Sequence, residues 1–237
     1  MRSPSLLENG DVHIWQIDVE GGIPYLPQLW DLLSLSERSR ACRFAREEDQ
    51  HQYIVSHGAL RCLLACYSNQ DPAAISFSTS PEGKPFLPSN RDIEFNLSHA
   101  HRLAVLAIAR TRVGIDIEHL RSLADAEWIA ERFFSHHERI QLQGLRADEK
   151  LVAFYRCWTR KEAFLKATGK GLSLPLNSFS VSTGLDEAEL IHAELGEYEP
   201  ALWKIANIST PHNYVGAVAI EGARAHLMHK VWTPICI

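Results

Sequence analysis

VGIDIE, at residues 113–118, lies halfway along a chain of 237 residues. Its apolar residues alternate with Gly114, Asp116 and Glu118, and this period of two predicts a β-strand. Side chains two residues apart in a strand point to the same face, so Asp116 and Glu118 form one acidic edge. The glycine before them allows another backbone segment, or a ligand, to approach closely. By itself, such an edge is most often simply solvated, so its meaning depends on what packs beside it.

A third carboxylate lies on a helix that we predict over residues 149–168. One ridge of this helix has a residue at every fourth position: Phe154, Trp158, Glu162 and Lys166. A partly exposed ion pair between Glu162 and Lys166 would contribute about 0.3–0.5 kcal/mol, and it is the simplest explanation of the two charges. It does not explain why two aromatic residues share their ridge. Because a lone ion is costly to bury, we expect these charges to have partners.

The chain on the two sides of the acidic strand has a similar order of elements. Before it we predict a strand at 12–19, helices at 35–44 and 47–67, and strands at 75–79, 92–97 and 103–109; after the strand at 112–118 we predict helices at 124–133, 136–144 and 149–168 and strands at 179–182, 202–208 and 214–220. The expected fold is α+β, with two similar subdomains related by a pseudo-two-fold axis, residues 1–111 and 112–237. Each has a small, mostly antiparallel sheet packed with helices, one of them long. The acidic strand then borders their junction, so we expect the active site in the cleft between them.

Composition excludes several classes of protein. With 46% hydrophobic and 22% charged residues the chain can bury a large core. Its net charge of −5 lacks the excess of basic residues that is typical of nucleic-acid-binding proteins. Residues 1–10 lack the apolar segment of a secretory signal, and the apolar run at 103–109 is too short to span a bilayer. The cysteines are scattered and odd in number: Cys42, Cys62, Cys66, Cys157 and Cys236. Reduced thiols are therefore expected, in a cytoplasmic protein with neither membrane nor nucleic acid as a partner.

The three carboxylates can converge on one point, with Lys166 one helical turn from Glu162. Oxygen donors of this kind suit a Mg²⁺ ion that holds a phosphate ester, and Mn²⁺ accepts the same ligands. His99, after a strand, and Lys84, in a Gly-Pro turn, are candidates for phosphate contacts, although a turn histidine and an exposed lysine are ordinary. The arginine cluster within residues 38–46 is a candidate for a terminal phosphate or a solvated helix face. The chain has no Walker loop, no dinucleotide fingerprint and no nucleophile elbow.

Five motifs, in this order and spacing, resemble those of the 4′-phosphopantetheinyl transferases of the two-halved, monomeric type that activates nonribosomal peptide and polyketide synthases. They are GKP at 83–85, NLSH at 96–99, VGIDIE at 113–118, RFF at 132–134, and WTRKEAFLK at 158–166 with GKGL at 169–172. The resemblance implies that coenzyme A lies between the two subdomains. It also implies transfer of the 4′-phosphopantetheine group to a serine of an acyl or peptidyl carrier protein, with release of 3′,5′-adenosine bisphosphate.

The same motifs imply roles for individual residues. Asp116, Glu118 and Glu162 would bind Mg²⁺, or Mn²⁺, together with the pyrophosphate of coenzyme A. Glu162, Lys166 and Asp116 would be catalytic, with Glu162 the base, directly or through a metal-bound water, for the carrier serine. The remaining contacts to coenzyme A would come from basic and polar groups: Arg40, Arg43, Lys84, Ser98, His99 and Lys166.

Two positions depart from the family pattern. Glu37 stands where a lysine is common, and Ala100 stands where a hydroxyl residue is common. Each puts one polar contact in doubt and neither touches the metal ligands. Two other functions remain open from the residues alone, a non-catalytic coenzyme A-binding scaffold and a coenzyme A pyrophosphohydrolase. A chain with two halves supplies its own cleft, so a monomer is expected. The sequence does not predict which carrier protein is preferred.

Overall fold

The computed structural model describes residues 7–184, 188–194 and 198–234. Its α-helices are α1 (Val19–Gly22), α2 (Leu26–Leu32), α3 (Leu35–Ala41), α4 (Glu47–Ser68), α5 (Ala126–Phe133), α6 (His136–Gln143) and α7 (Ala147–Thr168). Its strands are β1 (Asp11–Asp18), β2 (Ser78–Thr79), β3 (Pro85–Phe86), β4 (Glu94–Ala100), β5 (Leu103–Ala109), β6 (Val113–His119), β7 (Phe179–Val181), β8 (Leu190–Ala193), β9 (Trp203–Asn207), β10 (Tyr214–Glu221) and β11 (His226–Trp232).

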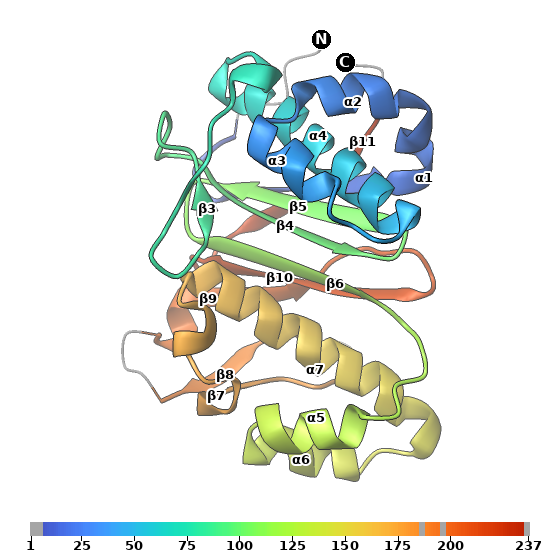
Figure 1. Ribbon diagram of the computed structural model, residues 1–237. Coiled ribbons are helices and arrows are strands. Elements are labelled where there is room, and N and C mark those ends of the chain that lie inside the picture. Colours follow the sequence, from blue (N-terminus) through green and yellow to red (C-terminus); the bar gives the residue numbers. More distant parts are fainter. Residues whose placement is uncertain (1–6, 185–187, 195–197, 235–237) are drawn as a thin grey trace.

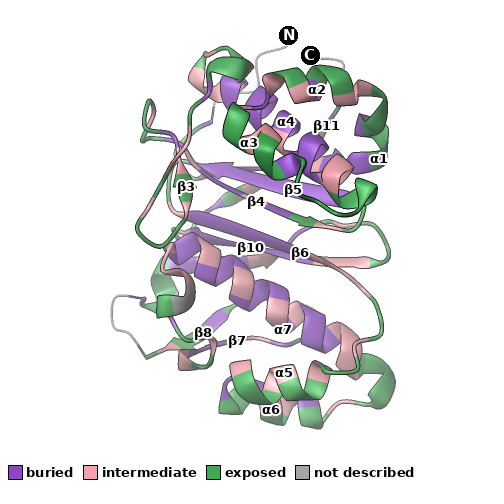
Figure 2. Ribbon diagram, in the orientation of Figure 1, coloured by how far each residue is buried: buried purple, intermediate pink, exposed green. Residues whose placement is uncertain are grey.

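The main elements form four layers, helix, sheet, sheet and helix, and β7, β8, α5 and α6 lie beyond α7 (Figure 1). One sheet has the strand order β11-β1-β5-β4 and is covered by α1–α4, and the other has the order β6-β10-β9 and is covered by α7. Apolar side chains of both sheets form the layer between them. Figure 2 shows that the sheets and the inner sides of α4 and α7 are buried, whereas α5 and α6 are largely exposed. The predicted α+β fold with two subdomains is confirmed.

The two long helices begin and end where local chemistry dictates. Acidic side chains occupy the first turn of α4 and of α7, where they interact favourably with the positive end of the helix dipole. Asn69 ends α4 and Gly169 ends α7, with φ of 53° and 71°. This left-handed conformation stops the helix and is tolerated by asparagine and glycine.

Strand β6 sends alternate residues to two different cores. Val113, Ile115 and Ile117 pack between the two sheets. Gly114 lies on the opposite face, where a Cβ atom would overlap the main chain of α7 at Ala163 and Ala167. The missing side chain therefore lets the backbone of α7 lie directly on β6, and it fixes how the helix sits beside Asp116.

The C-terminal strand departs from the expected division of the chain. The expected boundary between residues 111 and 112 separates the strands of the two sheets, except for β11. This strand belongs to the first sheet and pairs in parallel with β1, from Asp11 beside His226 to Ile17 beside Trp232. The residue pattern of 226–232 did not predict a strand. As an edge strand, β11 buries only Trp232 fully and has no strong apolar alternation. Helices α1 and α2 and the short strands β3 and β8 were also not predicted.

No helix in the described part of the chain is long and apolar enough to cross a membrane. Cys42 is exposed and Cys157 is buried, and both have free thiols. Cys236 lies outside the described residues.

Candidate functional site

The edges of the two sheets meet at β4 and β6, which lie side by side, and α7 packs along β6 at this junction (Figure 1). Each element brings polar residues to the junction: Ser98 and His99 from β4, Asp116 and Glu118 from β6, and Glu162 and Lys166 from α7. Residues from three separate segments are thereby brought together.

Asp116 is at the centre of this group and is only 5% exposed. Its Oδ1 atom lies 2.6 Å from Lys166 Nζ and accepts a hydrogen bond of 2.9 Å from the hydroxyl of Ser98. Lys166 also donates to Ser98 Oγ at 3.2 Å. The Oδ2 atom of Asp116 is buried and has no hydrogen-bond partner among the described residues. A buried carboxylate oxygen without a donor is costly, and a cation would satisfy it.

The two glutamates are electrostatically coupled to Asp116. Burial, followed by the charge of Asp116, raises the pKa of Glu118 to about 7; Glu162 adds to the shift, and Lys166 opposes it. The pKa of Glu162 is raised for the same two reasons, again against Lys166. The three carboxylates therefore lie close enough for their charges to repel one another.

This donor set fits a hard divalent cation such as Mg²⁺, because it consists of carboxylate oxygens, one of which is buried and has no partner among residues 7–184, 188–194 and 198–234. Within the described residues, however, no group of three His, Cys, Asp or Glu side chains already has the arrangement of a metal site. The carboxylates converge without forming a closed coordination shell. Some side-chain rearrangement around an ion would be needed.

Basic residues border the acidic group on the side of α3. Partial desolvation, followed by the charges of Lys166 and Arg40, lowers the pKa of His99. Arg40 lies over the ring of Tyr53, 5.6 Å from its centroid. Burial and Glu37 raise the pKa of Tyr53, and the charges of Arg40 and Arg43 oppose that rise. The arrangement leaves the exposed Arg40 close enough to His99 to act on it, and Arg43 close to Tyr53, so an anion can bind on this side of the site.

The ammonium of Lys84 is bound by oxygens of the protein and is not free to face a phosphate. Its ammonium lies 3.1 Å from the carbonyl oxygen of Val113, 3.3 Å from that of Ala167 and 3.3 Å from a carboxylate oxygen of Glu94. Burial lowers the pKa of Lys84, and Glu94 opposes the shift. The lysine thus joins β6 to the end of α7, and its contact with coenzyme A stays a prediction.

Glu37 has a structural partner that explains its charge. It forms a capping box with Ser34 at the start of α3 and accepts hydrogen bonds of 2.9 and 2.7 Å from Arg61. The same guanidinium, in a residue 1% exposed, also donates to the carbonyl oxygens of Pro72 and Ile75. The acidic residue at this position therefore holds α3 against α4.

Glu37→Gln should destabilise the protein by about 3 kcal/mol near neutral pH, because the buried Arg61 loses its anion. Burial alone would raise the pKa of Glu37, but hydrogen bonds from Arg61 and Ser34 outweigh it and hold the pKa below the ordinary 4.5. The stabilisation is therefore complete above pH 4.5 and is lost as the pH falls below it. Urea unfolding of both proteins across this range should show their stabilities converging in acid; a constant difference would contradict the assignment.

Lys161 lies next to Glu162 in sequence but points away from the site. Its ammonium is completely buried and lies 2.7 Å from both carboxylate oxygens of Glu138 and 2.7 Å from the carbonyl oxygen of Phe179. Glu138 also accepts the main-chain N–H groups of Ser135 and Val181. The pair ties α6 and β7 to α7. The pair also gives Glu138 a structural role. The two histidines before it in sequence do not have the spacing of a metal site.

Lys161→Met should cost about 3–5 kcal/mol of unfolding free energy, since it leaves Glu138 charged, buried and without its cation. Denaturant unfolding measures the loss. The double variant Glu138→Leu/Lys161→Met should recover part of it, because apolar residues can replace a buried ion pair. A double variant less stable than Lys161→Met would show that the other hydrogen bonds of Glu138 matter more than its charge.

Sequence reasoning gave no role to two residues at the site. Asn96 is buried in β4, and its Oδ1 atom accepts a hydrogen bond of 2.8 Å from the main-chain N–H of Ile115. Its signal was a polar amide within the motif NLSH, at a strand position flanked by apolar residues. Arg121 acts on Glu118 through its charge, which opposes the rise in pKa. No pattern distinguished it from other exposed arginines.

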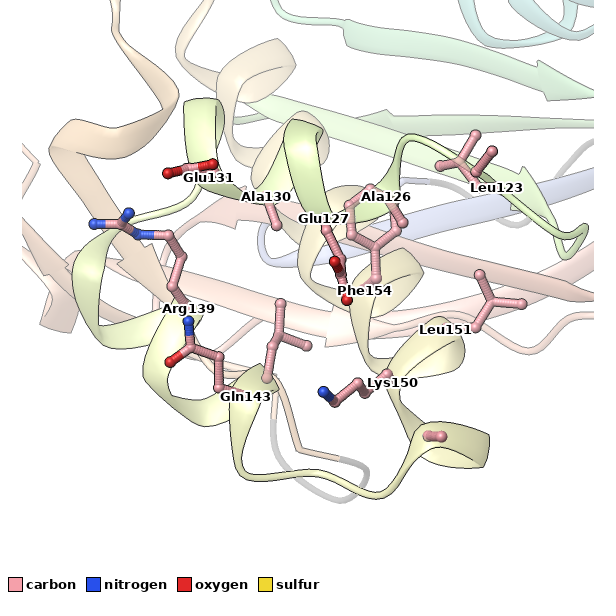
Figure 3. A pocket seen from close by; sticks show the side chains of 13 residues that line it. Leu123, Ala126, Glu127, Ala130, Glu131, Arg139, Gln143, Lys150, Leu151 and Phe154 are labelled. Carbon is pink, nitrogen blue, oxygen red and sulfur yellow. The ribbon is translucent and has the colours of Figure 1, made fainter.

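A cavity of about 690 Å³ lies elsewhere, between α5, α6 and α7 (Figure 3). Leu142, Leu151 and Phe154 line it together with the polar Glu127 and Arg139. Phe154 belongs to the ridge of α7 that leads to Glu162, but the predicted site residues do not line this cavity. We assign the functional site to the junction of β4, β6 and α7, since the convergent charges lie there.

Comparison with known proteins gives matches across most of the chain. The family model for the 4′-phosphopantetheinyl transferase N-terminal region matches residues 25–111, and that for the 4′-phosphopantetheinyl transferase superfamily matches residues 112–219. The 4′-phosphopantetheinyl transferase HetI of Nostoc sp. is 34% identical over 93% of this chain and 92% of its own length. A 4′-phosphopantetheinyl transferase of Bacillus subtilis and the transferase Sfp of the same species are 41% and 39% identical, each over 63% of this chain and 66% of its own length.

Proposed function

This chain belongs to the 4′-phosphopantetheinyl transferase superfamily, and from that premise we propose how its own residues carry out the reaction. It is an enzyme that transfers phosphopantetheine to carrier proteins. Our proposal adds coenzyme A as the donor and the β4–β6–α7 junction as the active site. One observation carries it: Asp116 is bound through one oxygen by Lys166 and Ser98, and its buried second oxygen has no hydrogen-bond partner in the described part of the chain.

In this proposal Asp116, Glu118 and Glu162 hold Mg²⁺, and Mn²⁺ would suit the same oxygen ligands. A bound divalent cation would neutralise charge on the pyrophosphate of coenzyme A. The raised pKa values of the two glutamates support the assignment, because burial and the neighbouring charge of Asp116 both disfavour their charged forms, and a bound cation would offset both effects.

Lys166 and His99 face the phosphates in this arrangement. Lys166 supplies a fixed positive charge, since its ammonium is held by Asp116 and Ser98. Arg40 and Arg43, both exposed, contact the 3′-phosphate, while Lys84 contributes its charge from its position beside Val113. Concentrating cations at the phosphates lowers the energy of a transition state in which negative charge moves to the leaving group.

Glu162 serves as the general base. The carrier serine is a weak acid, so its hydroxyl proton must be taken up as its oxygen forms a bond to phosphorus. A carboxylate whose pKa is raised by burial and by Asp116 accepts that proton more readily than an ordinary glutamate. The bond from the same phosphorus to the bridging oxygen breaks, and 3′,5′-adenosine bisphosphate leaves.

Mass spectrometry of an apo carrier protein incubated with the enzyme, coenzyme A and Mg²⁺ tests the proposal. The carrier should gain the mass of one phosphopantetheine group, and omission of Mg²⁺ should stop the gain. Carriers from fatty-acid, polyketide and peptide synthases, tested in parallel, would identify the preferred partner. Bisphosphate released without any carrier would indicate a pyrophosphohydrolase instead, and coenzyme A bound without either product would indicate a scaffold.

We further propose that the enzyme acts as a monomer in the cytoplasm. The polar groups of the candidate site all come from one chain, on β4, β6 and α7. Free thiols at Cys42 and Cys157 are typical of a reducing compartment.

A further inference from the structure

Strands β4 and β6 lie side by side, yet each is the last strand of a different sheet. A strand edge of this kind presents main-chain N–H and C=O groups that need partners. On β6, side chains supply them. The ammonium of Lys84 binds the carbonyl oxygen of Val113, and Oδ1 of Asn96 accepts the N–H of Ile115 at 2.8 Å.

The main-chain N–H that Asn96 binds belongs to Ile115, the residue before Asp116. Ser98 lies two residues further along β4, on the same face as Asn96, and donates its hydroxyl to the carboxylate of Asp116. The two residues thus hold consecutive parts of β6, Asn96 its main chain and Ser98 a side chain. Phe95, the residue before Asn96 on β4, points to the opposite face of the strand and belongs to the N-terminal core.

We propose that Asn96 is a positioning residue of the transferase. Its amide fixes the backbone of β6 beside Asp116, and so fixes the direction of the Asp116 carboxylate toward Lys166 and the proposed metal position. The inference rests on the proposed function of Asp116. An amide suits the task, because it accepts a main-chain hydrogen bond without adding a fourth negative charge beside Asp116, Glu118 and Glu162.

Asn96→Leu tests the proposal, because leucine has nearly the same volume and no acceptor. Phe95→Leu is the matched control, since it weakens the same strand from its other face. Amide hydrogen exchange at Ile115, measured relative to other β6 amides, should be at least about tenfold faster in Asn96→Leu only. Affinity for Mn²⁺, followed by electron paramagnetic resonance, should fall about 10–100-fold, as it does when residues that orient metal ligands are replaced. The value of kcat should fall with it, while KM for the carrier stays unchanged.

Asn96→Asp should restore slow exchange at Ile115, because a carboxylate oxygen can accept the same hydrogen bond. If Asn96→Leu does not fold, Asn96→Ala is measured in its place. Unchanged exchange and Mn²⁺ affinity, or equal losses in Phe95→Leu, would overturn the proposal. Failure of the proposed function has another signature: Mn²⁺ binding by the wild-type protein that is insensitive to Asp116→Asn. Exchange at Ile115 would then still show whether Asn96 fixes β6.

Discussion

Glu162→Gln is expected to lower kcat about 10²–10⁴-fold, the range that a positioned general base contributes. Glutamine keeps the size of the side chain but cannot take the proton of the carrier serine. The affinity for coenzyme A should change far less, because the basic groups that face its phosphates remain. Single-turnover transfer to a saturating carrier protein, together with calorimetric titration of coenzyme A, separates the two quantities.

Glu48→Gln is a matched control, since Glu48 is an exposed glutamate in the first turn of the other long helix. It should leave both quantities unchanged. An unaltered rate in Glu162→Gln would exclude Glu162 as the base. A loss of coenzyme A affinity as large as the loss of rate would show instead that Glu162 acts mainly in binding.

Gly114→Ala should damage both stability and activity. The new Cβ atom would overlap the carbonyl oxygen of Ala163 and the amide nitrogen of Ala167 and come within 2.8 Å of the carbonyl carbon of Lys166. These are main-chain atoms, so no side-chain rotation relieves the clash and α7 must move away from β6. Overpacking of this kind costs about 1–3 kcal/mol or more. A shift of about 1 Å at the site can lower the rate about 10²-fold.

Urea unfolding and the value of kcat/KM measure these two effects. Gly144→Ala is the control, because Gly144 ends α6 and a Cβ atom there meets only ordinary contacts of 3.6 and 3.8 Å with the main chain of α6. It should leave kcat/KM unchanged. Full activity in Gly114→Ala would mean that α7 and β6 tolerate separation, and that the spacing of Lys166 and Asp116 does not limit the reaction.

Local sequence was sufficient for the elements that carry the site. The alternation of apolar and polar residues at 113–118 predicted β6, and the repeat at every fourth residue from Phe154 to Lys166 predicted the ridge of α7. Both patterns depend only on near neighbours along the chain. The glycine at position 114 indicated a close approach, although only the structure shows that the approaching group is helix backbone and not a ligand.

The family and the α+β fold could thus be inferred from the order of residues, because repeating periods and motif spacing are properties of the chain itself. Tertiary structure alone decided that β11 completes the N-terminal sheet, that Glu37 neutralises Arg61, and that Asn96 holds the edge of β6. Each of these contacts joins segments far apart in sequence. Their energy comes from burial and from hydrogen bonds that form only once both segments are in place, so no local pattern records them.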